Sequence, residues 1–445
     1  MLTRAGSLLR PQILFSVGGI AALEFCFVML YRLRDLEVHV VETIAIAFAA
    51  GIFYFIALYA LEHTSENRAT LWLVLLGAVL FRLTLAPLAH TLSEDIYRYR
   101  WDGRVQRAGW NPYTIRPDDP RLGSLRNLAE PAGPGHDIPA VYPPLSELTF
   151  RIADRFLPSP VAFKLPFIAA DLLVVMLLAV WLRSIGARTY QLVVYAWNPL
   201  VIVEFAGSSH SDALALAALV GACVLIIRWR LRLSTILLAA GALFKIFPIM
   251  LMPLWLRLAG WPRKRAAWVN GLLAVAFALA CAWPYRSALA KVPEILSYYA
   301  SRWQDNNASL YSVLAWISGS RPFAELLGVS IAAGLALWAA WKQMEPARAA
   351  YLIFGAILLL SPNAYPWYFT WIIPFLCFYP NPAWLLLTIL QFLSYHVLID
   401  YYALNIWHWR AEMVWLTYGP FYAAWIGEMI RNRIAGKQPA GTNCV

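Results

Sequence analysis

Residues 71–103 read LWLVLLGAVLFRLTLAPLAHTLSEDIYRYRWDG, and this stretch contains the two features that decide the fold. Its first part, residues 71–90, is mostly apolar and has the length of a helix that crosses a bilayer, about 20 residues. The part that follows, residues 91–103, holds two adjacent acids, arginines and several aromatic rings. The stretch therefore predicts a membrane helix whose exit from the bilayer is marked by a strongly polar segment.

The composition of the whole chain extends this prediction from one helix to the entire protein. Of the 445 residues, 61% are hydrophobic and only 14% are charged, and the mean hydropathy is +0.58. A soluble protein usually carries about 25% charged residues, which leaves no solvated surface of normal size here. We predict an all-α polytopic membrane protein, a single membrane domain over residues 1–445 with about 12–14 transmembrane or half-membrane helices.

The predicted spans follow the apolar runs of the sequence. They are residues 11–31, 39–61, 69–89, 160–182, 190–205, 211–228, 233–244 with 246–257, 266–284, 322–341, 349–361, 366–380, 382–399 and 412–430. The five cysteines are scattered among these runs and the tail, a spacing that indicates neither a disulfide framework nor a metal site.

The basic residues predict how these spans are oriented. The net charge is +11, but arginine and lysine cluster at the ends of spans rather than in one patch, which argues against a nucleic-acid partner. Placing the clusters in the cytoplasm requires a break in the apolar stretch between Arg232 and Arg257, and Lys245 and Pro248 supply one.

With that break, three polar segments fall outside the spans on assigned sides. Residues 90–159 form a long outer loop, residues 285–310 a second outer loop, and residues 431–445 a cytoplasmic tail. The expected location is a bacterial inner membrane, with the outer loops facing the periplasm. Short amphipathic helices lying on the membrane surface are expected within residues 90–159.

The acids at the start of the long outer loop are the first candidates for chemistry. Glu94 and Asp95 are either ordinary interfacial charges or a general base at the edge of a low-dielectric bundle, suited to activating a hydroxyl group. Arg98 lies three residues after Asp95, and Asp102 lies four residues after Arg98. This spacing puts all three side chains on one helical face, where they can pair.

A second candidate cluster is the serine-rich turn that contains His210 and Asp212. Both residues are predicted on the same side of the membrane as the long outer loop, and they are either structural or part of a site. A His-x-Asp pair supplies too few ligands to argue for a metal ion. No metal site is therefore predicted, and no cofactor is required by any ligand cluster.

Two cations inside apolar segments form a third candidate group. A lysine in hydrocarbon costs about 2.5–3.5 kcal/mol on insertion scales, so Lys245 marks function unless its ammonium reaches the membrane surface. A compact ammonium beside a helix break is suited to holding a phosphate. Arg82, near the end of the third predicted span, raises the same two alternatives.

Aromatic and amide side chains in the outer segments are candidates for binding a sugar or its acceptor. Flat apolar faces suit sugar C–H surfaces and amides suit hydroxyl groups, but aromatic residues also form the ordinary interfacial belt. The candidates are Trp303 and Asn306 in SRWQDNN, Tyr365 and Trp367 in SPNAYPWYFTW, Tyr142 in VYPPLSELTF, and Asp212 in the serine-rich turn.

Four motifs together resemble a known enzyme family. They are SEDIYRYRWDGRVQRAGWNPY, the NPL…E…HSD turn, the K-x-x-P break and the SP…YPWY loop. They resemble bacterial polyprenyl-phosphate-mannose-dependent mannosyltransferases, members of the GT-C superfamily of integral membrane glycosyltransferases. The resemblance extends over roughly residues 80–375.

The resemblance implies a GT-C fold, a polyprenyl-phosphate sugar donor and an inverting transfer. It implies that Asp95, with Glu94 as the competing residue, is the catalytic base or orients the acceptor. It also implies that Lys245, Arg82, Arg98 and His210 neutralise the lipid phosphate. Metal dependence varies across the superfamily.

The expected acceptor is a lipid-linked glycan or glycolipid. No soluble domain follows the last predicted span, unlike some superfamily members that act on proteins. The rival from another class is a transporter or flippase of a lipid-linked sugar, but such proteins commonly contain internal repeats with paired broken helices. Membrane lipids are the other expected partners, and the sequence does not determine the oligomeric state.

Overall fold

The computed structural model describes residues 11–63, 68–89, 91–126, 135–157, 159–295, 297 and 306–434, and all regular structure within these ranges is helical. Seven of the described helices are long and apolar enough to cross a membrane. Five shorter apolar helices of 10–17 residues accompany them. The prediction of an all-α polytopic membrane protein is confirmed. Residues 435–445 of the predicted tail lie outside the described ranges.

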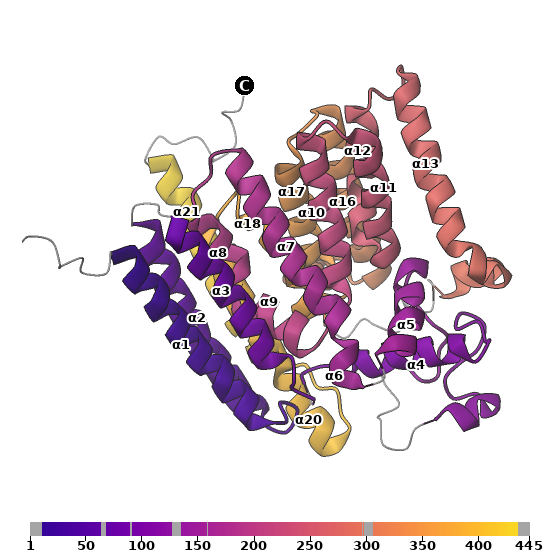
Figure 1. The fold of residues 1–445 in the computed structure, drawn as a ribbon, viewed down its shortest axis with the longest axis horizontal. Helices are drawn as coiled ribbons and strands as arrows, with labels where there is room; N and C mark the ends of the chain where they lie inside the picture. The colour runs from indigo at the N-terminus through magenta and orange to yellow at the C-terminus, as the bar shows by residue number, and fades with distance from the viewer. Residues whose placement is uncertain are drawn as a thin grey trace, which may run out of the picture. The chain divides into compact units, whose positions relative to one another are not determined.

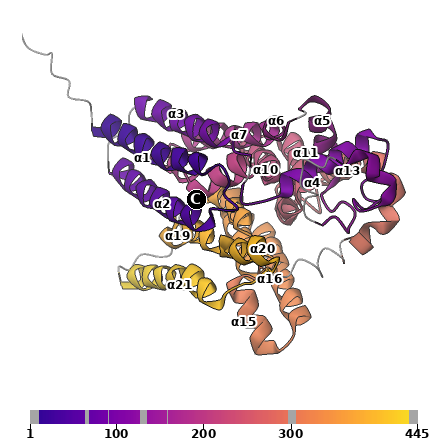
Figure 2. The ribbon, with the colours of Figure 1, turned by 90° about the horizontal axis from the view of Figure 1, so that it is seen from below.

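The chain divides into two compact units. Unit 1 contains residues 1–90, 178–203 and 373–445, and unit 2 contains residues 91–177 and 204–372. The helices of unit 1 are α1 (Pro11–Leu33), α2 (Val40–Glu62), α3 (Arg68–Leu85), α8 (Tyr190–Ala196), α9 (Pro199–Ile202), α18 (Ile373–Leu376), α19 (Pro382–Leu390), α20 (Val397–Leu404) and α21 (Ala411–Ile434). Helices α1, α2 and α3 lie side by side (Figure 2).

Unit 1 packs closely because small residues stand where a large ring must fit. The indole of Trp197 lies against Gly19 of α1 and Gly77 of α3, where an added methyl group would meet the ring. Its Nε1 donates a hydrogen bond of 2.9 Å to the carbonyl oxygen of Val74. Glycines that admit a neighbouring group this closely are typical of helix packing in membranes.

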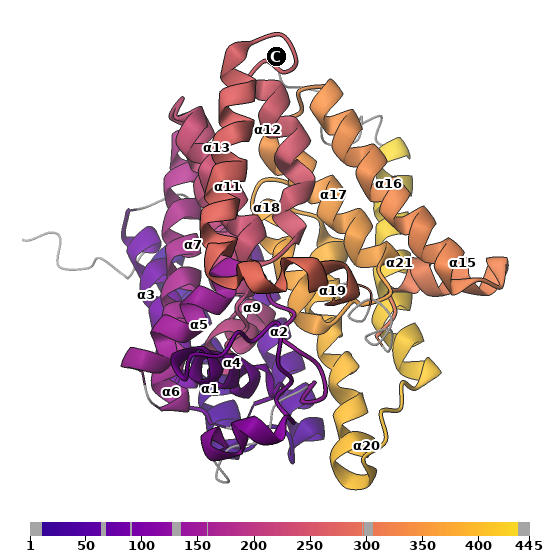
Figure 3. The same ribbon diagram turned by 90° about the vertical axis from the view of Figure 1, so that its right-hand side faces the viewer.

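Unit 2 contains α4 and α5, which follow the third apolar helix, and a second helical bundle. Its helices are α4 (Asp95–Arg107), α5 (Pro144–Phe156), α6 (Pro160–Phe163), α10 (Asp212–Ile227), α11 (Leu231–Phe244), α12 (Met252–Leu258), α13 (Arg265–Ala282), α15 (Ser309–Ser318), α16 (Arg321–Trp341) and α17 (Pro346–Leu360), while α7 (Leu165–Ser184) begins in unit 2 and ends in unit 1. Helices α4 and α5 lie side by side (Figure 1), as do α12, α16 and α17 (Figure 3).

Several helices of the two units have a proline at their first or second position, directly after a side-chain cap. Proline has no N–H to leave unpaired in the first turn, and a capping oxygen accepts from one of the remaining N–H groups. Ser159 caps α6, Asn198 caps α9, Ser320 caps α16 and Asn381 caps α19 in this way. The helix starts are therefore written locally in the sequence.

The predicted break near Lys245 is present. Helix α11 ends at Phe244, Lys245 has an extended backbone, and a short 3₁₀ helix, Phe247–Leu251, leads into α12. Pro248 lies within that 3₁₀ helix, where its ring cannot continue an α-helical hydrogen-bond ladder.

Two other predicted spans are interrupted rather than continuous. The segment predicted as one span over residues 190–205 consists of α8, α9 and a π-helical turn, Val203–Gly207. The segment predicted over residues 366–380 is a 3₁₀ helix, Pro366–Trp371, followed by α18. Pro199 is the first residue of α9, and Pro366 is the first residue of the 3₁₀ helix.

Helices α4 and α5 approach closely at Gly103. A methyl group there would collide with the main-chain carbonyl of Phe150 and press on the side chain of Asp154. Phe150 also stacks on Tyr99 of α4, with ring centroids 4.5 Å apart. Helix α5 therefore holds α4 in place from one side.

We expect Gly103→Ala to destabilise the protein, although alanine is the better helix former by roughly 1 kcal/mol. The added methyl group overpacks the contact between α4 and α5, which costs roughly 1–3 kcal/mol. The thermal unfolding midpoint in detergent should fall. Gly123→Ala is the matched control in the same outer segment, because its methyl group would meet nothing within 4 Å. A midpoint equal to that of the control would contradict the close packing.

Candidate active site

The candidate site residues of unit 2 come from four segments that are distant in the sequence. Asp95 is the first residue of α4, Asp212 begins α10, and Lys245 follows the last residue of α11. His210 lies in the turn before α10, and Trp367 lies in the 3₁₀ helix Pro366–Trp371. The sequence therefore distributes the site over segment ends, where side chains can converge without interrupting a helix.

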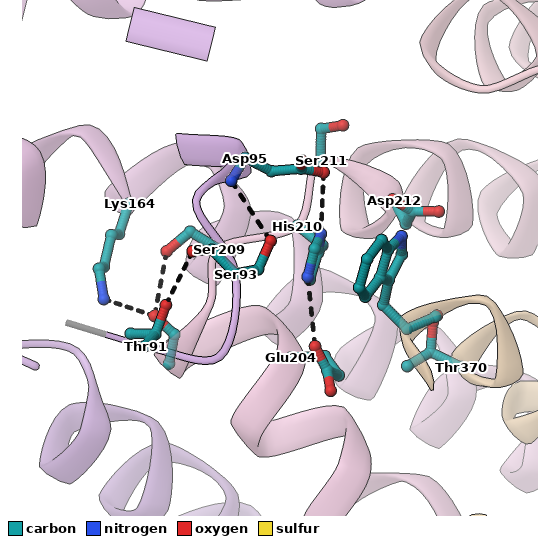
Figure 4. Close-up of polar contacts among 12 residues, drawn as sticks. Thr91, Ser93, Asp95, Lys164, Glu204, Ser209, His210, Ser211, Asp212 and Thr370 are labelled. Carbon is teal, nitrogen blue, oxygen red and sulfur yellow. Dashed lines mark hydrogen bonds and ion pairs between the residues drawn. The ribbon is translucent and has the colours of Figure 1, made fainter. Parts of the chain in front are cut away.

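His210 lies between two carboxylates (Figure 4). Its Nδ1 is 3.5 Å from Oδ2 of Asp95, and its Nε2 is 3.3 Å from Oε2 of Glu204. His210 and Glu204 are fully buried, whereas the Asp95 side chain is 17% exposed. The hydroxyl of Tyr99 donates a hydrogen bond of 3.2 Å to the same oxygen of Asp95. Asp95 is thus the member of this group that a substrate can reach.

The contact between His210 and Asp95 is an ion pair at neutral pH. Burial pushes the pKa of His210 down, but Asp95 and Glu204 push it up by more, to about 9. Burial likewise pushes the pKa of Asp95 up, but His210, Lys245 and Tyr99 bring it below its ordinary value. Both groups therefore carry their charges in a buried setting, where an unscreened ion pair is strong.

The turn that carries His210 is held by its own backbone and by a buried lysine. The π-helical turn Val203–Gly207 precedes it, and such turns occur frequently at functional sites. The backbone N–H of His210 donates to the carbonyl oxygen of Glu204 at 3.1 Å, and Ser209 adopts a positive φ of 66°. The ammonium of Lys164, 1% exposed, donates a hydrogen bond of 2.5 Å to the carbonyl oxygen of Gly207.

A second ion pair joins Lys245 to Asp212. The ammonium is 3.0 Å from Oδ2 of Asp212, and Oδ1 of the same carboxylate accepts a hydrogen bond of 2.7 Å from Nε1 of Trp371. The Lys245 nitrogen lies 5.9 Å from the centre of the Tyr142 ring and 5.3 Å from that of Tyr368. Asp212 is fully buried, while 14% of the Lys245 side chain remains exposed.

Tyr99 and Tyr142 connect the two ion pairs. Their ring centroids are 4.9 Å apart in an edge-to-face arrangement. Tyr99 contacts Asp95 through its hydroxyl, and the Tyr142 ring faces Lys245. The two ion pairs are therefore parts of one continuous cluster within unit 2.

Aromatic rings form one wall of this cluster. The Trp367 ring stacks on His210, with centroids 4.1 Å apart and planes 15° apart, and Tyr365 stacks on Trp367 at 4.7 Å. Tyr368 stacks on Trp371 at 4.4 Å. Tyr365 and Trp367 are partly exposed, so their rings can meet a flat ligand surface.

Asn306 positions this wall instead of lining it. Its side-chain nitrogen donates a hydrogen bond of 3.0 Å to the carbonyl oxygen of Ala364. The main-chain carbonyl oxygen of Asn306 accepts a hydrogen bond of 2.7 Å from the N–H of Ala364. Asn306 is 2% exposed. Trp303, the other candidate from the same loop, lies outside the described residues.

Glu94 occupies the N-cap position of α4, next to Asp95 in the chain, but its side chain makes no capping hydrogen bond. Burial, and then the charge of Asp95, raise the pKa of Glu94 above its ordinary value. Glu94 is partly exposed, so it also remains accessible to a substrate. The pKa of Glu94 is raised and that of Asp95 is lowered, so Glu94 holds a proton up to a higher pH than Asp95 does.

Arg98 makes the predicted pair with Asp102. Its Nε lies 3.1 and 3.0 Å from the two oxygens of Asp102, and its other nitrogens donate to the carbonyl oxygens of Gly135 and Ile138. Arg98 is 3% exposed. These contacts tie α4 to the segment at residues 135–138, so the guanidinium holds this helix and this segment together.

Arg82 lies in unit 1, apart from the other described candidates, which all belong to unit 2. It is fully buried, and its guanidinium donates to the carbonyl oxygens of Ala78 and Ala196 at 2.9 and 2.8 Å. These bonds join α3 to the end of α8. The buried arginine therefore satisfies main-chain groups within a helical bundle.

Glu204, Tyr99 and Trp371 belong to the cluster but were not among the residues selected from the sequence. Glu204 carried the clearest signal, because an acid within an apolar run is costly and by default functional. Tyr99 and Trp371 carried none, since aromatic residues are common throughout this chain. Within the described ranges, no group of three or more His, Cys, Asp or Glu residues could hold a metal ion.

We expect Arg98→Ala to destabilise the protein strongly, through the contacts that hold α4. It leaves the buried carboxylate of Asp102 without its cation, and breaking a buried pair in this way costs roughly 3–5 kcal/mol. The thermal midpoint in detergent measures the loss. Arg116→Ala is the control, because Arg116 pairs with Asp118 at 3.1 Å but is 59% exposed, where such pairs contribute about 0–1 kcal/mol. Equal midpoints for the two variants would refute the structural role of Arg98.

Comparison with known proteins identifies the family. Residues 13–260, more than half of the chain, match the MptA_B family model, described as alpha-(1->6)-mannopyranosyltransferase, N-terminal domain. No curated protein and no solved structure matches the chain. The match confirms the mannosyltransferase resemblance and favours it over a transporter. The chain therefore belongs to the MptA_B family of alpha-(1->6)-mannopyranosyltransferases, and it is a multi-pass membrane glycosyltransferase with mannosyl transfer activity.

Proposed function

We propose that the protein transfers mannose from a polyprenyl-phosphate donor to a hydroxyl group of a lipid-linked glycan or glycolipid, on the outer face of a bacterial inner membrane. Asp95 acts as the base and Lys245 meets the phosphate that departs. The observation that carries this assignment is the single cluster in which a partly exposed, ion-paired carboxylate and a partly exposed ammonium are joined through two tyrosines.

The chemistry of transfer requires these two charges. The acceptor oxygen attacks the anomeric carbon of mannose and loses its proton to the Asp95 carboxylate. The bond between that carbon and the phosphate oxygen breaks, and its electron pair stays on the phosphate. A positioned base and a positioned cation stabilise the charges that develop at the two ends of this displacement.

The surroundings of Asp95 favour it over Glu94 as the base. Asp95 is anchored by His210 and by the Tyr99 hydroxyl, so its carboxylate has a defined orientation. The contacts with His210 and the charge of Lys245 lower the pKa of Asp95, which keeps the carboxylate ionised and able to accept a proton. Burial and the charge of Asp95 raise the pKa of Glu94, which remains the competing candidate.

Lys245 is the cation best placed to meet the donor phosphate. Part of its side chain is exposed, and the Asp212 carboxylate and the Tyr368 ring fix its position. Arg98 and Arg82, which the resemblance also suggested, are buried and bound to other protein groups. His210 is fully buried as well, so we assign it no direct contact with phosphate.

The stacked rings of Tyr365 and Trp367 are proposed to hold a sugar ring. Their planes differ by only 4°, so each ring covers one face of the other, and the remaining face of the partly exposed Tyr365 ring offers a flat apolar surface for a sugar. The family name specifies an alpha-(1->6) bond, and we propose the same linkage for this chain. If the transfer inverts the anomeric centre, the donor must then be a beta-linked mannosyl phosphate.

We expect Asp95→Asn to lower the turnover rate by about 10²–10⁴-fold, because the amide cannot accept the proton. Donor affinity should stay near the wild-type value. Transfer of radiolabelled mannose from polyprenyl-phosphate-mannose measures the rate, and donor titration measures the affinity. Asp118→Asn, an exposed acid of the same outer segment, is the control. Turnover equal to the control would refute the assignment, and loss of transfer only in Glu94→Gln would make Glu94 the base.

Lys245→Ala should weaken donor binding by about 1.5–3 kcal/mol, roughly ten- to a hundredfold, since a charge-assisted contact with phosphate is lost. Titration of the polyprenyl-phosphate donor measures this, with a thermal melt alongside it to separate lost affinity from lost fold. Lys291→Ala removes an exposed lysine from the outer segment Trp283–Lys291 and should bind the donor normally. An unchanged donor affinity in Lys245→Ala would contradict the role.

A further inference from the structure

Glu204 and His210 are buried residues next to Asp95. Glu204 and His210 are both fully buried, so neither can touch a sugar or a phosphate. They are nevertheless linked in a line, Glu204 to His210 to Asp95, which ends at the one member that is exposed. His210 can therefore act on the reaction through the groups that it contacts, and Asp95 is the charged one among them that is exposed.

We infer that His210 is a positioning residue, an imidazolium that holds the Asp95 carboxylate in its catalytic orientation while Glu204 holds the imidazolium. This inference rests on the proposed role of Asp95 as the base. It departs from the expectation that His210 binds the lipid phosphate.

The ring geometry leaves His210 only one arrangement. Trp367 covers one face of the imidazole at 4.1 Å and nearly parallel, while the two carboxylates occupy opposite ring nitrogens. The backbone N–H of His210 is bonded to the carbonyl oxygen of Glu204, so the turn itself is fixed. A cation stacked on an indole is further stabilised by the ring electrons.

The charge on the imidazole decides whether this line can exist. An imidazolium has two N–H donors and can serve both carboxylates, whereas a neutral imidazole has one donor and one lone pair. Loss of the proton therefore turns one of the two contacts into a repulsion between a lone pair and a carboxylate. Asp95 or Glu204 would then lose its partner.

The charged and titratable groups around this turn come from every element packed against it. They are Asp95, Glu94 and Tyr99 from the start of α4, Glu204 from the π-helical turn, Asp212 from α10, Lys245 from the end of α11 and Lys164 from the junction of α6 and α7. The two carboxylates in direct contact with His210 raise its pKa to about 9, against the effect of burial. The imidazolium is thus the state present at neutral pH.

Two effects on the pH dependence of kcat/KM follow. In His210→Gln, Asp95 loses a cation at contact distance, so the acidic limb of the profile should move to higher pH, by about 1–3 units. In Glu204→Gln, His210 loses one of the two carboxylates that raise its pKa, so the alkaline limb should move from about pH 9 to lower pH. A residue with a purely structural role would lower the whole profile without moving either limb.

The experiment measures mannose transfer from polyprenyl-phosphate-mannose across pH for the wild type, His210→Gln and Glu204→Gln. His136→Gln is the matched control, because His136 is an exposed histidine of the same outer segment, and it should leave both limbs in place. The limb shifts described above support the inference. Profiles with unmoved limbs in both variants overturn it, and Glu204→Gln alone decides if His210→Gln does not fold.

A thermal melt tests the charge of His210 without using activity. A group whose pKa is raised by folding stabilises the protein fully below its unfolded pKa, about 6.5, and loses that effect as pH rises through its folded pKa, about 9. The wild-type midpoint should exceed that of Glu204→Gln below pH 6.5, and the difference should shrink toward pH 9. A difference that is the same at every pH overturns the inference even if Asp95 is the base. Transfer retained by Asp95→Asn refutes the proposed role of Asp95, and the melt then still reports whether His210 is charged.

Discussion

The contact between His210 and Asp95 is the interaction on which the site depends. It places opposite charges at the start of α4 and in the turn before α10, in a chain of which 61% is hydrophobic. In such surroundings an isolated charge is costly, but a paired and hydrogen-bonded one is tolerated. The π-helical turn Val203–Gly207 and the buried Lys164, which bonds the carbonyl oxygen of Gly207, hold the turn that carries His210.

Opposite charges are also paired elsewhere in unit 2. Lys245 is paired with Asp212, and Arg98 is paired with Asp102, so these buried charges also have partners of opposite sign within unit 2. What distinguishes Asp95 and Lys245 is that each remains partly exposed while its partner is fully buried. The buried partners fix the positions of the exposed members, which we propose meet the acceptor hydroxyl and the donor phosphate.

Much of this arrangement could be predicted from local sequence. The interruption at Lys245 and Pro248 followed from charge placement, and the pairing of Arg98 with Asp102 followed from a spacing of four residues. The contacts of Asp95 could not be predicted, because His210 and Glu204 are more than a hundred residues away and no local pattern encodes that distance. The two extra helix interruptions were missed because a run that contains proline can still cross a membrane as a kinked helix.

The most direct measurement of the central claim is a density map of the protein with a non-transferable polyprenyl-phosphate-mannose analogue. The account predicts the phosphate within hydrogen-bonding distance of Lys245, the anomeric carbon on the side of Asp95, and His210 still between Asp95 and Glu204. A phosphate bound away from Lys245, with the mannose ring remote from Asp95, would contradict it.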